Sequence, residues 1–373
     1  MARTGGVRRQ ATLATLAASL KVSRTTVSNA YNRPDQLSPA LRERVLREAA
    51  RLGYPGPDPV ARSLRTRKAG AVGLLLTEAL SYAFRDPAAV DFLAGLSEAC
   101  ESAGQGLLLV PAHPGRDRAA ASRAVLSAGV DGFVVYSVAE DDPYLGAVLK
   151  RPVPTVICDQ PMALAGVDRV GIDDRAAVRE LGEHLIGLGH RRFGVLCMRL
   201  GRDRSDGLAM RQRWQRATFH VQRERIGGLA DALSAAGGDL TGMPVVERYE
   251  HLVEQGQSAA AQALDADTSI TALVCTTDVL ALGALREARH RGIDVPAQLT
   301  VTGFDGVPQA LTEGLTTVRQ PVEDKGRAAG RLLLTPPEPG AGRPGPRTVV
   351  LPTQLVLGRT SSSPQAPKWF SGL

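Results

Sequence analysis

Long apolar runs are absent from this sequence of 373 residues. No stretch approaches the 18 or more consecutive apolar residues that a membrane-spanning helix needs. The N-terminal stretch MARTGGVRRQAT carries positive charges, but the apolar segment that follows such charges in a secretory signal is missing. We therefore expect a soluble protein that has no membrane partner and stays in the cytoplasm.

Cysteine and histidine are scarce, and their spacing predicts no metal site. The four cysteines lie far apart, mostly in apolar and strand-like stretches: Cys100, Cys158, Cys197 and Cys275. None of them forms the closely spaced pair that a zinc site uses, and the six histidines show no ligand spacing either. We expect buried thiols in a reducing compartment, with no metal and no cofactor.

Catalytic motifs are also missing. The sequence contains no hydrolase elbow, phosphate-binding loop or zinc-protease motif. GAGRPG at residues 340–345 formally matches a dinucleotide-binding glycine pattern, but no strand precedes it, no helix opens from it, and prolines surround it. We interpret this stretch as a linker and expect no enzyme. An α/β enzyme is kept as a weak alternative.

Charge is distributed unevenly along the chain. Residues 1–68 hold 14 basic and four acidic residues, a net charge of +10, which leaves −3 for the rest of a chain whose formal total is +7. A basic head on a slightly acidic body is typical of a nucleic-acid-binding module joined to another domain. Charge alone would be explained more simply by a solvated face. With 43% apolar residues, the chain can bury at least two cores.

Residues 1–56 show the pattern of three short helices. In ATLATLAASL, Thr12 caps a helix whose leucines fall on one face. After the turn KVS, Ser23 caps a second helix, RTTVSNAY, and Ser38 begins a third helix that Gly53 closes. Two short helices joined by a three-residue turn and packed on a third make a helix-turn-helix.

The second helix presents a polar face that suits double-stranded DNA. Its apolar residues must face the helices beneath, which leaves four polar residues outward: Arg24, Thr25, Ser28 and Asn29. Arginine can bond the two acceptors of guanine, and asparagine the acceptor and donor of adenine. Ser23 and Thr26 are better placed for phosphates, which position the protein without specifying sequence. We expect this helix to enter a major groove.

Three stretches of the head carry a resemblance to a known family: ATLATLAASLKVSRTTVSNAYN, LSPALRERVLREAARLGY and VARSLR. They closely resemble the lactose-repressor family of bacterial transcription regulators. In that family a hinge helix follows the three helices, and its leucine enters the minor groove. The resemblance implies a hinge within residues 57–68, with Leu64 as the wedge. The complete predicted DNA-binding set is Thr12, Ser23, Arg24, Thr25, Thr26, Ser28, Asn29, Asn32, Arg62, Leu64 and Arg65.

Two features of the head depart from the family pattern. Lys21 stands at a turn position that is usually held by a small residue, so it should adopt a positive φ at modest cost. The link GYPGPDPVARSL is one residue longer than in the best-known members, so the start of the hinge is left open.

After the hinge, apolar strands alternate with amphipathic helices. AVGLLL, GQGLLLVPA, DGFVVYSV, VPTVICDQ, RRFGVLCM, ALVCTTD and LTVTGFDG are predicted strands, mostly with helical stretches between them. This pattern predicts an α/β fold with parallel sheets. It resembles the family's effector domain, a two-lobed fold like that of periplasmic sugar-binding proteins. We place this domain at 69–373, with crossings near 171, 319 and 340, lobe one at about 69–171 and 320–336, and lobe two at about 172–319 and 345–363.

A ligand is expected between the lobes, where the strands of open α/β sheets end. The resemblance implies an effector-contacting set of Phe84, Asp159, Ile172, Arg225, Thr277, Asp278 and Asp305. Carboxylates accept hydrogen bonds from hydroxyls or amines, and Arg225 can donate two parallel bonds to neighbouring oxygens. Because Thr277 stands where the family commonly has asparagine, the family's sugar preference cannot be carried over. Each aspartate could instead be a helix cap or a strand-end turn.

One stretch is longer than the family's typical connection. RLGRDRSDGLAMRQRWQRATFHVQ, residues 199–222, carries six arginines and two aspartates before residue 218, and should lie near the cleft mouth. It is either a solvated loop or a segment that contacts an anionic effector or partner.

These observations together predict a homodimeric transcription regulator. A dimer that presents two copies of the second helix should bind a pseudo-palindromic operator. We expect a repressor whose DNA affinity is set by a small-molecule effector, sugar-like or anionic, bound between the lobes. Repression rather than activation is implied only by the resemblance. A stand-alone sugar-binding protein, the other alternative, would need a signal peptide and no basic head.

Overall fold

The structure is a computed structural model that describes residues 11–57, 63, 66–76, 83–111, 117–162, 164–335 and 345–365. The chain divides into two compact units, Met1–Ala69 and Gly70–Leu373. The first unit is called the head and the second the body. Within the described ranges, no helix is both long enough and apolar enough to cross a membrane.

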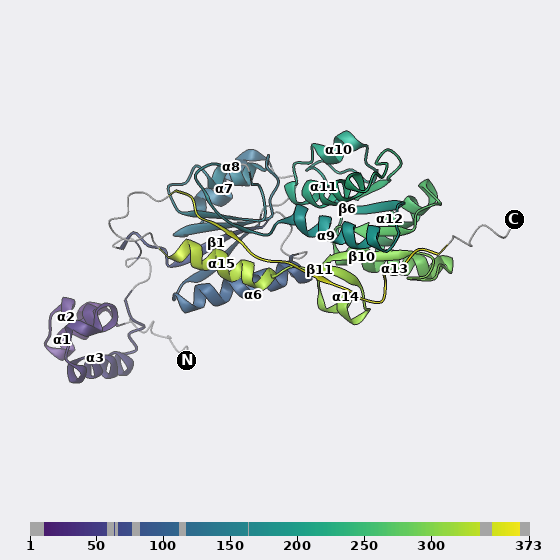
Figure 1. Cartoon of the computed structure of the whole chain (residues 1–373). Coiled ribbons are helices and arrows are strands. Elements are labelled where there is room, and N and C mark those ends of the chain that lie inside the picture. The colour runs from purple at the N-terminus through teal and green to yellow at the C-terminus, as the bar shows by residue number, and fades with distance from the viewer. Residues whose placement is uncertain are drawn as a thin grey trace, which may run out of the picture. The chain divides into compact units, whose positions relative to one another are not determined.

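Within residues 11–57, the head contains three α-helices (Figure 1). They are α1 (Leu13–Leu20), α2 (Arg24–Asn32) and α3 (Pro39–Leu52), with a 3-10 turn, η1 (Pro34–Gln36), before α3. The predicted caps are confirmed, since the Thr12, Ser23 and Ser38 hydroxyls each accept a hydrogen bond from a backbone N–H in the first turn of the following helix. These bonds satisfy donors that a helix start would otherwise leave free.

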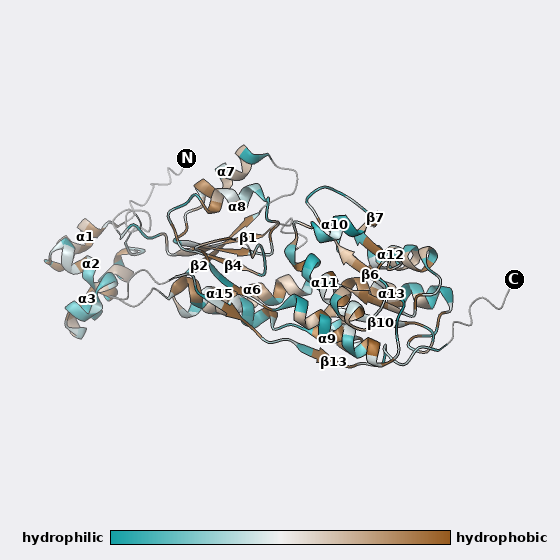
Figure 2. Cartoon of the chain, turned by 45° about the horizontal axis from the view of Figure 1, so that its top comes forward, coloured by the Kyte–Doolittle hydropathy of each residue, from teal (hydrophilic) through white to brown (hydrophobic). Residues whose placement is uncertain are grey.

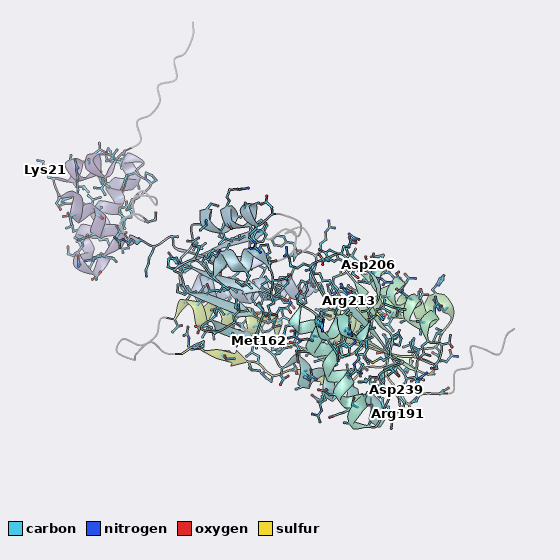
Figure 3. All side chains as sticks on the ribbon, turned by 90° about the horizontal axis from the view of Figure 1, so that it is seen from above. Lys21, Met162, Arg191, Asp206, Arg213 and Asp239 are labelled. Atoms are coloured by element: carbon cyan, nitrogen blue, oxygen red, sulfur yellow. The ribbon has the colours of Figure 1, made fainter. Side chains whose placement is uncertain are left out.

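The core of the head lies between the three helices. Its buried members are Leu16, Ala17, Val27, Ala30, Val45 and Ala49. Lys21 ends α1 with a φ of 53°, so the predicted positive φ is confirmed. Its side chain lies at the surface of the head (Figure 3).

The described residues of the body form two sheets, and the first belongs to lobe one. Its strand order is β12 (Thr348–Val350), β5 (Asp168–Gly171), β4 (Thr155–Cys158), β3 (Gly132–Tyr136), β1 (Ala71–Leu76) and β2 (Gly106–Pro111). All neighbouring pairs are parallel, as predicted. Helices α6 (Pro87–Ser102) and α15 (Val322–Leu334) cover one face, and α7 (Arg118–Ser127) and α8 (Pro143–Val148) cover the other (Figure 1).

The second sheet forms lobe two. Its order is β13 (Gln354–Val356), β11 (Thr316–Arg319), β10 (Thr300–Asp305), β9 (Ala272–Cys275), β6 (Phe193–Met198), β8 (Val245–Arg248) and β7 (Gly207–Leu208). The edge strands β13 and β7 are antiparallel to their neighbours, and the other pairs are parallel. The helices are α9 (Asp174–Gly187), α10 (Arg211–Gln215), α11 (His220–Ala235), α12 (Val253–Ala266), α13 (Asp278–Arg291) and α14 (Pro308–Thr312).

The central strands of both sheets are mostly apolar, although β10 also buries Thr300 and Thr302. Figure 2 shows them as brown arrows between helices that carry hydrophilic residues outward. Helices α9, α10 and α11 contribute to the core on one face of the second sheet, and α12, α13 and α14 to the core on the other. Strands covered on both faces are typically near-continuous apolar runs, which explains why stretches such as AVGLLL identified them.

The chain crosses between the lobes three times, and the third crossing corrects a prediction. The first crossing follows Gly171 and the second follows Arg319, as expected. The third was placed near residue 340, with 345–363 assigned to lobe two. However, β12 pairs with β5 in lobe one, and β13 pairs with β11 in lobe two. The third crossing therefore lies between Val350 and Gln354.

Helices α6 and α15 of lobe one pack backbone to backbone. A Cβ atom added at Gly326 would overlap the backbone of Phe92, and one added at Gly95 would overlap the backbone of Glu323. Glycine at both positions therefore allows the two helices to approach closely and to form one packed layer under the sheet.

The arginine-rich stretch 199–222 is folded onto lobe two, so it is not an open solvated loop. It supplies the edge strand β7, the helix α10 and the start of α11. Trp214 is buried in the lobe-two core. Arg213, labelled in Figure 3, pairs with the buried carboxylate of Glu247 through Nη2 and Oε1 at 2.8 Å. The charges of this segment are thus used partly to hold it in place.

Candidate functional sites in the head and the interlobe cleft

Helix α2 presents the polar face that was predicted for it. Arg24 and Thr25 are exposed, Ser28 and Asn29 are half-buried, and Val27 and Ala30 face the core. The Asn29 amide donates to Gln36 Oε1 at 3.1 Å, which holds it beside η1. A row of arginine, hydroxyl and amide groups on one helix face can contact base edges and phosphates.

Other residues of the predicted DNA-binding set hold the head together. Thr12 and Ser23 are helix caps, and the Ser23 and Thr26 hydroxyls lie 2.8 Å apart. Asn32 donates from Nδ2 to the Ser28 carbonyl at 3.0 Å, so its amide is turned toward its own helix. Arg62, Leu64 and Arg65 lie outside the described residues.

A cavity in the body lies between the two lobes, and we refer to it as the cleft. It is lined by residues from both lobes: Leu76, Ala83, Asp86, Ala88, Ala89, Tyr136, Ser137, Asp159, Gln160, Met198, Arg199, Phe219, Val221, Gln222, Arg225, His251, Thr277, Asp305 and Gln320. Many of them stand at or just beyond the carboxyl ends of β3, β4, β6, β9, β10 and β11. The cleft thus lies where an open α/β sheet is expected to bind a ligand.

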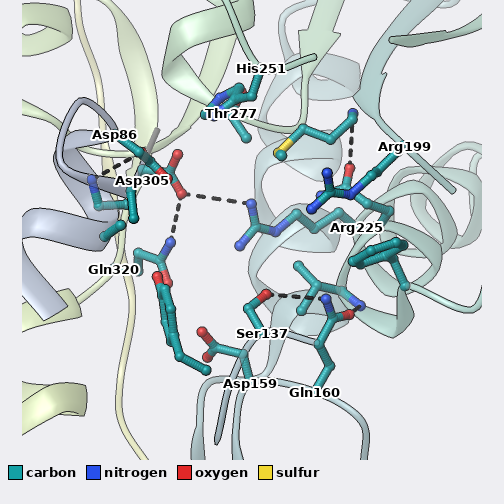
Figure 4. A pocket seen from close by; sticks show the side chains of 18 of the residues that line it. Asp86, Ser137, Asp159, Gln160, Arg199, Arg225, His251, Thr277, Asp305 and Gln320 are labelled. Atoms are coloured by element: carbon teal, nitrogen blue, oxygen red, sulfur yellow. Dashed lines mark hydrogen bonds and ion pairs between the residues drawn. The ribbon is translucent and has the colours of Figure 1, made fainter. Parts of the chain in front are cut away.

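Four of the seven predicted effector residues line the cleft. Asp159, Arg225, Thr277 and Asp305 are among its walls, and Figure 4 shows their side chains converging from both lobes. Phe84, Ile172 and Asp278 are not among the lining residues. Phe84 is 58% exposed, and Ile172 packs into the lobe-two core.

Asp278 is better explained as a structural cap than as a ligand contact. Its Oδ2 accepts from the backbone N–H groups of Gly306 and Val307 at 2.7 and 2.8 Å, and its Oδ1 accepts from the Thr317 hydroxyl at 2.6 Å. Burial, followed by the nearby charge of Asp305, raises the pKa of Asp278 to about 7. Asp278 fixes the turn that follows Asp305, so it helps to position a residue of the cleft without lining the cleft itself.

Arg225 is buried at the centre of the cleft wall. Its Nε donates to Asp174 Oδ1 at 2.7 Å and its Nη1 to the Thr276 carbonyl at 2.6 Å, while Asp305 Oδ1 lies 3.7 Å from Nη1. The guanidinium lies over the Phe304 ring at 3.6 Å from its centroid. Burial alone would lower the pKa of Arg225, but the carboxylates of Asp174 and Asp305 outweigh burial and raise it.

Two carboxyl groups of the cleft are protonated more easily than usual. Burial raises the pKa of Asp305 to about 6; the nearby Arg225 opposes this shift and Asp86 adds to it. Asp86 caps α6 by accepting from the Ala88 N–H at 3.2 Å, and burial raises its pKa to about 6 as well. The two groups come from opposite lobes. Because both are negative when ionised, they repel each other across the cleft.

Strained backbone accompanies the cleft. Ser137, Asp159 and Asp305 have positive φ values of 52°, 64° and 117°. Such conformations cost about 1–3 kcal/mol each in a non-glycine residue and persist only where the surrounding structure enforces them. Their occurrence at three strand ends that face one cavity indicates that side-chain direction there is constrained.

Several lining residues were missed by the sequence reasoning. Gln160 directly follows Asp159, and Gln320 directly follows β11, so position after a strand was the available signal. His251 bonds the Thr277 hydroxyl through Nε2 at 2.8 Å, and burial lowers the pKa of His251 to about 4. Nothing in the local sequence marked His251. Among the described residues, no group of three or more His, Cys, Asp or Glu side chains is arranged to hold a metal.

Comparisons with known proteins agree with this architecture. Residues 183–361 match the model of a periplasmic binding protein-like domain. An HTH-type transcriptional regulator of Mycobacterium tuberculosis is 61% identical over 357 residues, covering 96% of this chain and 98% of the relative. The crystal structure of a LacI family transcriptional regulator from Corynebacterium glutamicum is similar, with a TM-score of 0.71, 40% identity, and coverage of 94% of this chain and 98% of that one.

A ligand-bound structure is similar as well. The transcriptional regulator CelR in complex with cellobiose has a TM-score of 0.67 and 28% identity, covering 94% of this chain and 99% of that chain. Identity extends over almost the full length of these proteins, across both the head and the body. The chain therefore belongs to the lactose-repressor (LacI) family of helix-turn-helix transcriptional regulators.

Proposed function

We propose that this protein is a homodimeric repressor that binds a pseudo-palindromic operator. A small molecule bound in the cleft raises or lowers the affinity of the protein for that operator. The observation that carries the proposal is the cleft itself, whose walls come from both lobes and are rich in buried hydrogen-bonding groups. A ligand held by both lobes favours one lobe arrangement over others, and only such a preference can change affinity at another site. A regulator of chromosomal DNA acts in the cytoplasm.

Helix α2 supplies the proposed base-reading surface. Arg24 is the strongest candidate because it is exposed and stands in the first turn of the helix. Thr25, Ser28 and Asn29 lie on the same side of α2. Operator DNA of two matching half-sites follows from the two-fold symmetry of a dimer.

The chemistry of the cleft favours an uncharged molecule with several hydroxyl groups. Asp159 is paired with Lys325 and Arg225 is paired with Asp174, so two of the strongest charges are already neutralised within the protein. Two donors of Arg225 are committed to protein groups, which leaves Nη2 for a ligand oxygen. The remaining carboxylates can accept hydrogen bonds from hydroxyls. The cellobiose bound by CelR is a ligand of this class.

The proposal is tested in two steps. A thermal-shift screen of sugars, polyols, nucleosides and organic acids identifies molecules that stabilise the folded protein by mass action. Fluorescence anisotropy with an operator found by randomised-site selection then measures whether a hit changes DNA affinity. By linkage, the operator must change the affinity for the hit by the same factor. A hit that binds tightly and leaves operator affinity unchanged would refute control through the cleft.

The same selection tests the head. Arg24→Ala should lose about 1–3 kcal/mol of discrimination at one base pair of each half-site. Arg33→Ala, an exposed arginine beyond the predicted base-reading positions, is the matched control and should not change the preferred sequence. A uniform loss of affinity for all sequences with Arg24→Ala would show that this residue contacts phosphates instead.

A further inference from the structure

A lysine is completely buried behind the wall of the cleft. Lys325 lies on α15 with none of its surface exposed, and its Nζ donates three hydrogen bonds. Asp159 Oδ1 and Oδ2 accept at 2.8 Å each, and Gln320 Oε1 accepts at 2.6 Å. An ammonium has three N–H donors, so all are used, and all go to residues that line the cleft.

The contacts continue from Lys325 into lobe two. Gln320, at the second crossing, donates from Nε2 to Asp305 Oδ1 at 2.6 Å, and Asp305 lies beside Arg225. The amide of Gln320 therefore has its oxygen fixed by the lysine and its nitrogen fixed by the aspartate. Removing the ammonium would leave Asp159 without its cationic partner. It would also leave the oxygen of the Gln320 amide without the donor that fixes it.

A buried carboxylate needs a positive partner. An unpaired charge in the protein interior costs several kcal/mol, so a carboxylate in a cleft without a resident cation is a strong site for a cationic ligand. In this chain Lys325 donates to both oxygens of Asp159 and does not itself line the cavity. A ligand ammonium approaching Asp159 would compete with Lys325 and be repelled by it.

We infer that Lys325 is the internal counter-ion of Asp159 and the positioning residue that makes the Asp159 side of the cleft select an uncharged ligand group over a cationic one. This inference rests on the proposed function of the cleft as the ligand site. Lys325 does not line the cavity itself, so it acts through Asp159 and Gln320. Burial alone would lower the pKa of Lys325, but the Asp159 carboxylate outweighs it and raises the pKa, so the ammonium stays charged.

The test uses the full chain and a pair of small probes of similar size, ethanolamine, which is a cation at pH 7, and ethylene glycol, which is neutral. Lys325→Met keeps the length of the side chain and removes its charge. The melting temperature is measured against probe concentration, with sodium chloride matched for ionic strength. Ethanolamine should raise the Tm of Lys325→Met in a saturable way by about 2 °C, and ethylene glycol should not.

Three controls decide the outcome. The wild-type protein and Lys150→Met, which removes an exposed lysine of lobe one, should show equal responses to ethanolamine, both smaller than that of Lys325→Met. Lys325→Met/Asp159→Asn should respond no more than the wild-type protein, because the carboxylate that the loss of Lys325 exposes is gone. Lys325→Gln, which retains a donor amide, replaces Lys325→Met if the latter does not fold.

The inference is overturned if ethanolamine stabilises the double variant or the wild-type protein as much as the single variant, or if it stabilises none of them. The measurement needs neither operator nor natural effector. If ligands fail to change operator affinity, a stabilisation of Lys325→Met by ethanolamine still supports the inference about Lys325. If ethanolamine has no effect, the measurement of operator affinity is still valid.

Discussion

Replacement of Arg225 by methionine gives the sharpest test of how the cleft is held together. The change preserves an unbranched side chain of similar length and removes the cation. Asp174 loses the bond from Nε, Asp305 loses its nearest positive charge, and the Thr276 carbonyl loses a donor. Because Asp174 and Asp305 are buried, neither can regain full hydration.

The expected cost is large for a single substitution. Removing one partner of a buried ion pair destabilises a protein by about 3–5 kcal/mol, since the other charge stays buried and uncompensated. For a large domain this corresponds to a fall in Tm of about 10 °C. Arg223→Met is the matched control, because Arg223 is partly exposed and its pair with Glu224 is worth less than about 1 kcal/mol. Urea denaturation followed by circular dichroism measures both variants.

The loss of unfolding free energy in Arg225→Met, which we call the deficit, should depend on pH. Burial raises the pKa of Asp174 above its unfolded value even though Arg225 opposes the shift, and loss of Arg225 raises that pKa further. The folded variant therefore holds a proton that the unfolded chain releases above about pH 4, so its stability falls as pH rises from there through the folded pKa. The loss relative to wild type should be smaller at pH 5 than at pH 8.

Two results would refute this reasoning. A deficit for Arg225→Met that is equal to that of Arg223→Met would mean that the buried pair contributes nothing. A deficit that is the same at pH 5 and pH 8 would mean that the uncompensated carboxylates do not cause it. Arg225→Met/Asp174→Asn should recover at least part of the loss, since it removes one of those carboxylates.

Three further predictions concern single residues. Asp278→Ala should lower the free energy of unfolding by about 3 kcal/mol, because it leaves buried N–H and hydroxyl groups without an acceptor; a variant as stable as wild type in urea would contradict its role as a cap. As the pH rises from 4.5 to 7.5, the free energy of unfolding of Asp86→Asn should increase by about 1–3 kcal/mol relative to that of the wild-type protein. The reason is that the folded pKa of Asp86, about 6, lies above its unfolded value, so wild-type stability falls over that window. Parallel pH profiles of the two proteins would disprove this prediction. Lys21→Gly should stabilise the head by about 1 kcal/mol by relieving its φ of 53°, seen as slower hydrogen exchange in α1 and α2, and unchanged exchange would argue against strain there.

The sequence by itself determined the elements and the family. Helix caps such as Thr12 and Ser23 act within a few residues, and strands buried on both faces are mostly apolar, so both leave local signals. The helix-turn-helix and the parallel sheets followed from those signals, whereas the crossings between the lobes were implied by the family resemblance. Short strands with weaker patterns, such as β5, β8 and β12, left no such trace and were missed. As a result, the third crossing was misplaced.

Tertiary structure alone decided how the charged residues are used. Asp278 and Asp305 look equivalent in sequence, each at the end of an apolar strand, yet one is enclosed by three donors and the other faces the cleft. Lys325 appears in sequence as one more basic residue of an amphipathic helix, and its partner Asp159 is 166 residues away. A charge becomes a counter-ion only when folding removes water from around it and brings an opposite charge within reach, and no local pattern records that event.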